Sequence, residues 1–177
     1  MEINRVWEMP NSRTFKIRAI RNIILKYVKE GDTVIDPFAN ESNIKEHLPK
    51  SCKYISNDLD TQYNNDYHLE AQDFLQLFDD NSIDVVLYDP PYSGRQVSEC
   101  YKSLGRSVTM SDTNSGYFTK FKKEIARVLK PNGIVITCGW NTNGVGKKYG
   151  MNLLEVLDIA HGGAHYDTLV TVERKII

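Results

Sequence analysis

The sequence predicts an α/β fold with a doubly wound sheet that is mostly parallel and ends in an antiparallel hairpin strand. Short runs of strand-forming residues alternate with amphipathic helical segments along most of the chain. Several of these runs stop at an aspartate, and open α/β sheets place their ligands at the carboxyl ends of their strands. The last two runs, 153–160 and 166–172, are joined by His161-Gly162-Gly163-Ala164. This short connection is typical of a hairpin, so one of the two strands is expected to be antiparallel to the sheet.

Each element follows from a local pattern. Residues 1–13 show little periodicity and are expected to form an extended arm. From Thr14 onward, apolar residues such as Ile20 and Ile24 recur at helical spacing and predict the first helix. Proline has no N–H to donate, so strands are expected to end at Pro37 and Pro90. The other expected elements are a strand at 34–35, a helix at 42–48, a strand at 53–58, a weak strand at 67–71, a short helix from Asp73 to about Phe78, strands at 83–88 and 134–138, helices at 96–104 and 117–130, a turn at 131–133 and a mobile loop at 143–150.

The composition is that of one globular domain over residues 1–177, with 41% hydrophobic and 25% charged residues and no repeat. No stretch approaches the roughly 20 apolar residues of a membrane span. The first residues lack the apolar segment of a secretion signal, and the three cysteines are scattered. A cytoplasmic protein without disulfides or a metal site is therefore expected. The net charge of −1 argues against a strongly basic nucleic-acid binder, so any such contact must use a local patch.

The chain is organised around residues 83–92, Ile-Asp-Val-Val-Leu-Tyr-Asp-Pro-Pro-Tyr. The strand-forming run ends at Asp89, and two prolines stop the backbone ladder at once. A carboxylate, an unpaired carbonyl and the Tyr92 ring are thereby presented at the carboxyl end of a strand. The simpler reading of this stretch is a strand followed by a proline-rich turn with a solvated aspartate.

Four acidic residues follow predicted strands, and an aromatic residue follows a fifth. They are Asp36, Asp58, Asp73, Asp89 and Trp140. In a doubly wound sheet all five line one rim. Aspartates at strand ends can instead cap the following helix, which explains any one of them but not all four together.

These motifs in this order resemble the S-adenosylmethionine-dependent amino-methyltransferases, specifically the adenine-N6 branch. The resemblance rests on Asp36-Pro37-Phe38-Ala39, then Asp58, Asp73 and Asp89-Pro90-Pro91-Tyr92, and it spans nearly the whole chain. It implies a Rossmann-like class I methyltransferase sheet and S-adenosylmethionine as the cofactor.

The resemblance also implies residue roles. Asp89 and the Pro90 carbonyl would accept hydrogen bonds from the exocyclic amine of the target base, and Tyr92 would stack on that base. Asp58 would bind the ribose hydroxyls and Asp73 the adenine amino group of the cofactor. The implied catalytic set is Asp89, Pro90, Pro91 and Tyr92. The implied cofactor set is Thr14, Phe15, Asp36, Pro37, Phe38, Ala39, Asn40, Asp58, Leu59, Asp73, Phe74 and Asp89.

The loop after the first strand departs from the family. Glycines usually allow the backbone to approach the cofactor there, whereas this chain has Ala39-Asn40-Glu41-Ser42. Asn40 is expected to take the positive φ that a glycine would take, because Asn tolerates it better than most residues. Glu41 would repel the carboxylate of the cofactor if it pointed inward.

No segment of about 100 residues remains for a separate target-recognition domain, so the loops at 93–116 and 141–150 are the candidates for nucleic-acid contact. The alternative for their cations is solvated loop charge. The candidate nucleic-acid residues are Arg95, Lys102, Arg106, Trp140, Asn141, Lys147 and Lys148.

The function expected from these features is methyl transfer to the N6 of adenine in DNA, with loose specificity or with a protein partner that supplies recognition. One alternative is adenine in RNA or single-stranded DNA, because an unpaired base avoids the cost of flipping. A cytosine-N4 target is disfavoured because that branch more often has Ser in place of Asp89. A non-catalytic subunit with the same fold is the remaining alternative, and the altered loop at 39–42 favours it.

Overall fold

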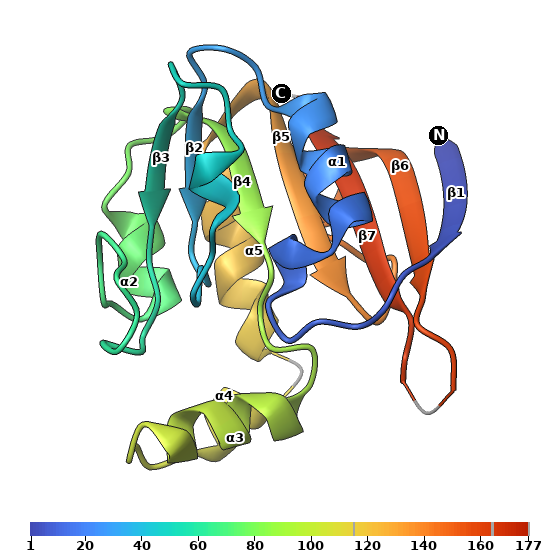
Figure 1. Ribbon diagram of the computed structural model, residues 1–177. Helices are drawn as coiled ribbons and strands as arrows, with labels where there is room; N and C mark the ends of the chain where they lie inside the picture. The colour runs from blue at the N-terminus through green and yellow to red at the C-terminus, as the bar shows by residue number, and fades with distance from the viewer. Residues whose placement is uncertain (115, 164, 177) are drawn as a thin grey trace.

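A seven-stranded sheet runs through the computed structural model, which describes residues 1–114, 116–163 and 165–176. Its strand order is β1-β6-β7-β5-β4-β2-β3 (Figure 1). Strand β7 is antiparallel to both of its neighbours, and the other neighbouring pairs are parallel. The sheet confirms the predicted fold class, including the reversed strand of the last hairpin.

The strands are β1 (Glu2–Trp7), β2 (Thr33–Asp36), β3 (Lys53–Ser56), β4 (Ile83–Tyr88), β5 (Leu129–Gly139), β6 (Met151–Ala160) and β7 (Thr168–Lys175). The α-helices are α1 (Arg18–Tyr27), α2 (Ala71–Gln76), α3 (Gly94–Ser103), α4 (Met110–Thr113) and α5 (Tyr117–Val128), and the 3₁₀ turns are η1 (Thr14–Lys16), η2 (Ile44–Glu46) and η3 (Lys147–Tyr149). None of the helices in the described ranges combines the length and apolarity that crossing a membrane requires.

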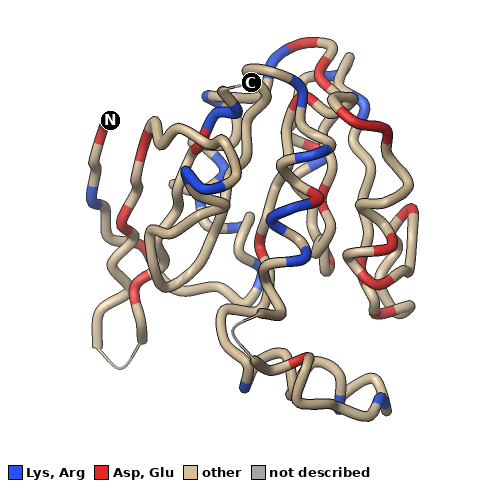
Figure 2. The backbone as a smooth tube through the Cα atoms, turned by 180° about the vertical axis from the view of Figure 1, so that it is seen from behind, with Lys and Arg blue, Asp and Glu red and all other residues tan. Residues whose placement is uncertain are grey.

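Helices cover both faces of the sheet, as the alternation predicts. Helix α1 packs on one face, where it meets Val85 and Leu87 of β4. Helices α2 and α5 pack on the other face, where they meet Val86 and Tyr88 of the same strand. Seen from behind, α5 lies in front of the middle of the sheet and carries several charged residues (Figure 2). Because alternate residues of β4 feed two separate cores, this strand is buried on both faces.

The N-terminal arm is more ordered than the sequence predicts. Residues Glu2–Trp7 form β1, which pairs in parallel with β6 from Glu2↔Glu155 to Trp7↔Ala160. All six residues of the strand are exposed. Backbone hydrogen bonds to β6 therefore stabilise this strand. It has no apolar pattern from which the sequence could predict it.

Two predicted elements are absent from the described residues. The helix expected at 42–48 is only the 3₁₀ turn η2, because Pro49 stops the chain before a second turn can form. The strand expected at 67–71 is a single bridge between Asn57 and Tyr67. The backbone N–H of Leu69 donates to the side chain of Asn57 at 2.9 Å instead of continuing a ladder.

Two connections also differ from expectation. The turn at 131–133 lies inside β5, at a register shift opposite Ile83–Val85 of β4, with Asn132 at a φ of 66°. The loop at 143–150 is packed rather than mobile, since Glu173 accepts hydrogen bonds from the backbone of Val145 and Gly146.

Candidate functional site

A cavity of about 850 Å³ opens at the carboxyl ends of β2, β3 and β4. Their arrowheads point to the end of the sheet where α3 and α4 lie (Figure 1). The segments 10–17, 37–43, 57–60 and 89–92 line the cavity, together with parts of α3 and of the β6–β7 connection. The segment 10–17 includes Thr14 and Phe15, so the chain before α1 forms the wall opposite the strand ends, as the resemblance implies.

Asp36 supports the cavity from below and does not line it. Its side chain is fully buried and accepts hydrogen bonds from the Tyr54 hydroxyl at 2.9 Å and from the Phe38 N–H at 3.3 Å. These contacts hold the turn that follows β2. Burial, reinforced by the nearby charge of Asp89, raises the pKa of Asp36 from 3.8 to about 8. The structure therefore places Asp36 outside the cavity lining, where it holds the turn that borders the cavity.

The turn at 37–41 adopts the predicted conformation although it contains no glycine. Pro37, Phe38 and Ala39 line the cavity, and Asn40 has a φ of 49° in the left-handed region. The Asn40 N–H donates to Asp58 at 2.7 Å, which ties the turn to the end of β3.

The charge of Glu41 is compensated within the chain. Its carboxylate forms an ion pair with Arg13 from the opposite wall. Since the pair joins the N-terminal segment to the turn after β2, it links two walls of the cavity. Glu41 also lines the cavity, but its partner offsets the repulsion that the sequence suggests.

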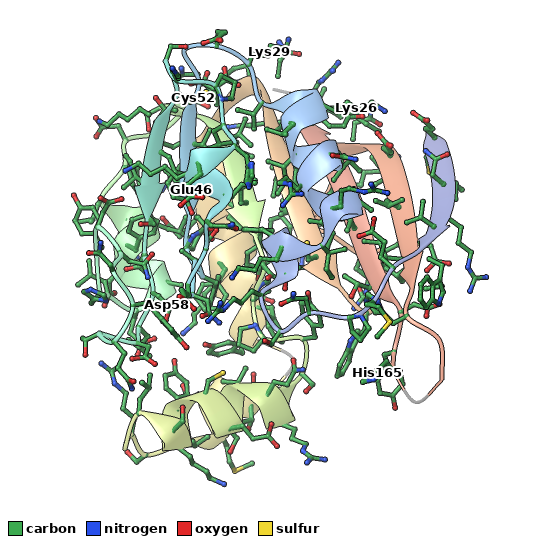
Figure 3. All side chains as sticks on the ribbon, in the orientation of Figure 1. Lys26, Lys29, Glu46, Cys52, Asp58 and His165 are labelled. Atoms are coloured by element: carbon green, nitrogen blue, oxygen red, sulfur yellow. The ribbon has the colours of Figure 1, made fainter. Side chains whose placement is uncertain are left out.

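Asp58 projects beyond the end of β3 into the cavity lining, beside Leu59. One carboxylate oxygen accepts the Asn40 N–H and the other accepts the Asp60 N–H at 2.9 Å. Burial raises the pKa of Asp58, and these two hydrogen bonds partly offset the rise. The carboxylate is therefore fixed in place, and its further lone pairs can accept from hydroxyl groups of a ligand. Figure 3 places Asp58 below the end of β3.

Asp89, Pro90, Pro91 and Tyr92 all line the same cavity. The Tyr92 hydroxyl donates to Asp89 at 2.7 Å. Burial raises the pKa of Asp89, while the hydroxyls of Thr14 and Tyr92 lower it in part. The structure thus brings the four residues that follow β4 together with Asp58 and the turn at 37–40.

Two predicted cofactor residues lie elsewhere. Asp73 lines a second, smaller cavity of about 520 Å³, and Phe74 is fully buried against Phe78. Glu70 lines the main cavity instead. Helix α2 begins at Ala71, so Glu70, which leads into the helix, borders both cavities, whereas Asp73 within the helix borders only the second.

Most of the predicted nucleic-acid residues are not brought to the cavity. Arg95 pairs with Glu99 on the exposed face of α3, and Arg106 pairs with Glu70 beside the second cavity. Lys102 is exposed on α3, and the Asn141 side chain accepts from the N–H of Asn143. The remaining two, Lys147 and Lys148, lie in η3 just before the start of β6, at the opposite end of the strands from the cavity.

Trp140 does line the cavity, and sequence reasoning missed its neighbours. Its ring packs against Tyr92, with centroids 5.6 Å apart, and against Tyr166, with centroids 4.9 Å apart. Tyr166 and His165 come from the β6–β7 connection, where Figure 3 labels His165. The sequence spacing of a hairpin connection does not indicate that it will lie beside the end of β4. This proximity is therefore seen only in the folded structure.

The cavity lining is acidic. Of its Asp, Glu, Lys and Arg residues, six are acidic and only Arg13 and Lys16 are basic. This balance favours a ligand with positive charge over a polyanion inside the cavity. Within the described ranges, no three His, Cys, Asp or Glu side chains are grouped to hold a metal ion.

Neither a protein-family model nor a curated protein matches the sequence. Solved structures do match the fold. TrmN from Thermus thermophilus matches with a TM-score of 0.63 and 17% identity over 90% of this chain, which spans about half (49%) of the TrmN chain. The 1,6-didemethyltoxoflavin-N1-methyltransferase from Burkholderia thailandensis, solved with 1,6-didemethyltoxoflavin and S-adenosylhomocysteine, matches with a TM-score of 0.63 and 11% identity over 90% of this chain and 78% of that one.

A third match is the complex between the Haloferax volcanii Trm112 methyltransferase activator and a methyltransferase, with a TM-score of 0.60 and 14% identity over 93% of this chain and 90% of that one. At these identities the likeness concerns the fold. This chain has the Rossmann-like fold of the class I methyltransferases.

Proposed function

We propose that this chain binds S-adenosylmethionine in the main cavity and transfers the methyl group to the exocyclic N6 of adenine in DNA. The observation that carries the proposal is the shared cavity. Asp89 and Pro90 at the end of β4 face the same 850 Å³ space as the turn at 37–40 and Asp58. A donor and an acceptor of a methyl group need to meet in one such space.

The residues fit the cofactor. The backbone of the turn after β2 would hold the methionine end, because Asn40 adopts the positive φ that lets this turn approach a ligand. Asp58 would accept from the ribose hydroxyls, and Glu70 would take the adenine-binding role first assigned to Asp73. When bound, S-adenosylmethionine supplies an electrophilic methyl group on a positively charged sulfonium. The acidic lining of the cavity suits that charge.

The residues after β4 fit the acceptor. The exocyclic amine of adenine is a poor nucleophile because its lone pair is delocalised into the ring. Asp89 and the Pro90 carbonyl would accept its hydrogen bonds, favour a pyramidal nitrogen and stabilise the positive charge that develops there. The Tyr92 hydroxyl holds one oxygen of Asp89 at 2.7 Å, so the carboxylate is oriented before the base arrives. The Tyr92 ring would stack on the base.

A second candidate substrate is adenine in RNA or in single-stranded DNA. The electrostatics of the site favour it, because Arg95 and Arg106 pair with nearby carboxylates and Lys147 lies at the other end of the strands. Few cations are therefore left beside the cavity to hold a duplex, and an unpaired base needs no flipping.

A protein partner could supply the missing contacts. The similar fold found in a complex with the Trm112 activator supports such an arrangement. It does not favour one polymer over another.

The test is transfer of a radiolabelled methyl group from S-adenosylmethionine to duplex DNA, single-stranded DNA and RNA of the same sequence, followed by nucleoside analysis. N6-methyladenosine or its deoxy form is the expected product. Label on cytosine, on a small molecule or on protein would contradict the adenine assignment. Absence of label in every arm, together with no binding of S-adenosylmethionine, would favour the non-catalytic subunit.

A further inference from the structure

Three aromatic rings lead from the floor of the cavity to the surface. Tyr92 and Trp140 pack edge to face at 5.6 Å, and Trp140 and Tyr166 pack at 4.9 Å with an interplanar angle of 43°. Exposure rises along the series, to 39% for Trp140 and 74% for Tyr166. The rings come from the ends of β4 and β5 and from the β6–β7 connection. Stacking on the target base would account for Tyr92 but not for Trp140 or Tyr166.

The outer ring is held in a braced loop. At the start of this loop His161 is buried, with one ring nitrogen 2.8 Å from the Glu8 carbonyl and the other 2.8 Å from the Thr168 hydroxyl. Asp167, next to Tyr166, accepts from the His161 N–H at 3.3 Å and from Arg5 at 3.4 Å. These contacts join the loop to β1 on one side and to β7 on the other. Tyr166 and Trp140 pack on each other and together form an exposed aromatic surface that lines the cavity.

We propose that Trp140 and Tyr166 form a stacking site for the base adjacent to the target, so that the substrate is an unpaired nucleic-acid strand. The proposal rests on the function proposed above and names its substrate class. Aromatic rings bind the faces of bases without regard to sequence, and proteins that bind single strands use successive rings in this way. A base within a duplex is stacked on both faces, so it cannot also stack on Tyr166.

The charges nearby fit a strand that enters along the N-terminal wall. The segment 13–18 carries Arg13, Lys16 and Arg18. Arg13 pairs with Glu41 and Arg18 with Glu8, whereas Lys16 has no ion pair among the described residues and lines the cavity. Phosphates would remain at this wall while the neutral bases face the rings. A small aromatic amine would fill only the space beside Tyr92 and would leave Tyr166 without a role.

The test measures binding of fluorescein-labelled decamers, each with one adenine in a pyrimidine background, by fluorescence anisotropy in the presence of S-adenosylhomocysteine. Tyr166→Ala is expected to weaken binding of the single strand by about 5- to 150-fold, the range for loss of one base–aromatic stack. Tyr166→Phe keeps the ring and is expected to bind as the wild type does. Tyr67→Ala is the matched control, because Tyr67 is an aromatic residue with 41% exposure that lies outside the cavity lining.

Shortening the strand gives a second readout. Methyl transfer to adenosine monophosphate is expected to be much less efficient than transfer to the decamer, and Tyr166→Ala is expected to remove most of that advantage. Equal binding by wild type and Tyr166→Ala, or a preference for the duplex, would overturn the stacking site even if adenine is methylated. Binding of the single strand through Tyr166 without any methyl transfer would instead overturn the proposed reaction and leave the stacking site standing.

Discussion

Replacing Asp36 with Asn should change how the stability of the protein depends on pH. Asp36 is fully buried, and its pKa rises from 3.8 to about 8 in the folded protein. Between these two values the unfolded chain carries the charge while the folded protein keeps the proton. A rise in pH then stabilises the unfolded state relative to the folded one, and the contribution of Asp36 to stability is lost as pH approaches 8.

The size of the effect follows from the proton linkage. Each pH unit between the two pKa values lowers the free energy of unfolding by about 1.4 kcal/mol for this one group. Between pH 5 and pH 7 the wild type should therefore lose about 3 kcal/mol relative to Asp36→Asn. Asn is neutral and close in shape to the protonated carboxyl. Its single acceptor oxygen can face only one of the two donors, the Tyr54 hydroxyl or the Phe38 N–H, which adds a cost that does not vary with pH.

The assay is urea denaturation of both proteins at pH 5, 6 and 7, with the difference in unfolding free energy plotted against pH. Asp112→Asn is the control that should show no pH dependence in this range, because hydrogen bonds from Thr109 lower the pKa of Asp112 and its carboxylate is charged in both states from pH 5 to 7. Its carboxylate contributes stability above the ordinary pKa of Asp, and that contribution is lost as pH falls. A difference between wild type and Asp36→Asn that stays constant from pH 5 to 7 would show that Asp36 is ionised in the folded protein and would refute the reasoning.

Two further predictions concern the cofactor side of the cavity. Asp58→Asn should weaken S-adenosylmethionine binding by about 10- to 150-fold in calorimetric titration, because a hydrogen bond to a charged group contributes ~1.5–3 kcal/mol; unchanged affinity would remove Asp58 from the ribose site. Asn40→Val should destabilise the protein by ~1–2 kcal/mol in thermal unfolding, because a β-branched residue resists the φ of 49°, whereas Asn40→Gly should fold as well as the wild type. Equal melting temperatures for the two Asn40 variants would contradict this account of the turn.

The sequence predicted the central part of the fold because strong local signals define it. Strand β4 matches the predicted run at 83–88, and α5 begins at the predicted Tyr117. In both, apolar periodicity and flanking breakers agree with the tertiary packing. Strand β1 was missed because its residues are all exposed and show no apolar pattern. Backbone pairing with β6 and polar contacts such as the Arg5–Asp158 ion pair hold it.

The candidate site was predictable where residues follow buried strands. Asp58 and Asp89 extend directly from β3 and β4, so their place in the cavity follows from strand order. Asp73 lies outside the main cavity because α2 begins at Ala71, and helix boundaries are the weakest part of such predictions. Glu70 and Tyr166 needed the fold, since their contacts join segments far apart in sequence.

The role of Asp89 in methyl transfer is tested most directly by single-turnover transfer with wild type and Asp89→Asn, alongside calorimetric titration of S-adenosylmethionine with both proteins. Asp89 lines the cavity and is proposed to accept from the amine, so the variant should bind S-adenosylmethionine within a few-fold of wild type while the rate of transfer to adenine falls by about 100-fold or more. Transfer by Asp89→Asn at the wild-type rate would contradict the account. So would an equal loss of cofactor binding and transfer, because Asp89 would then act on the donor rather than on the amine.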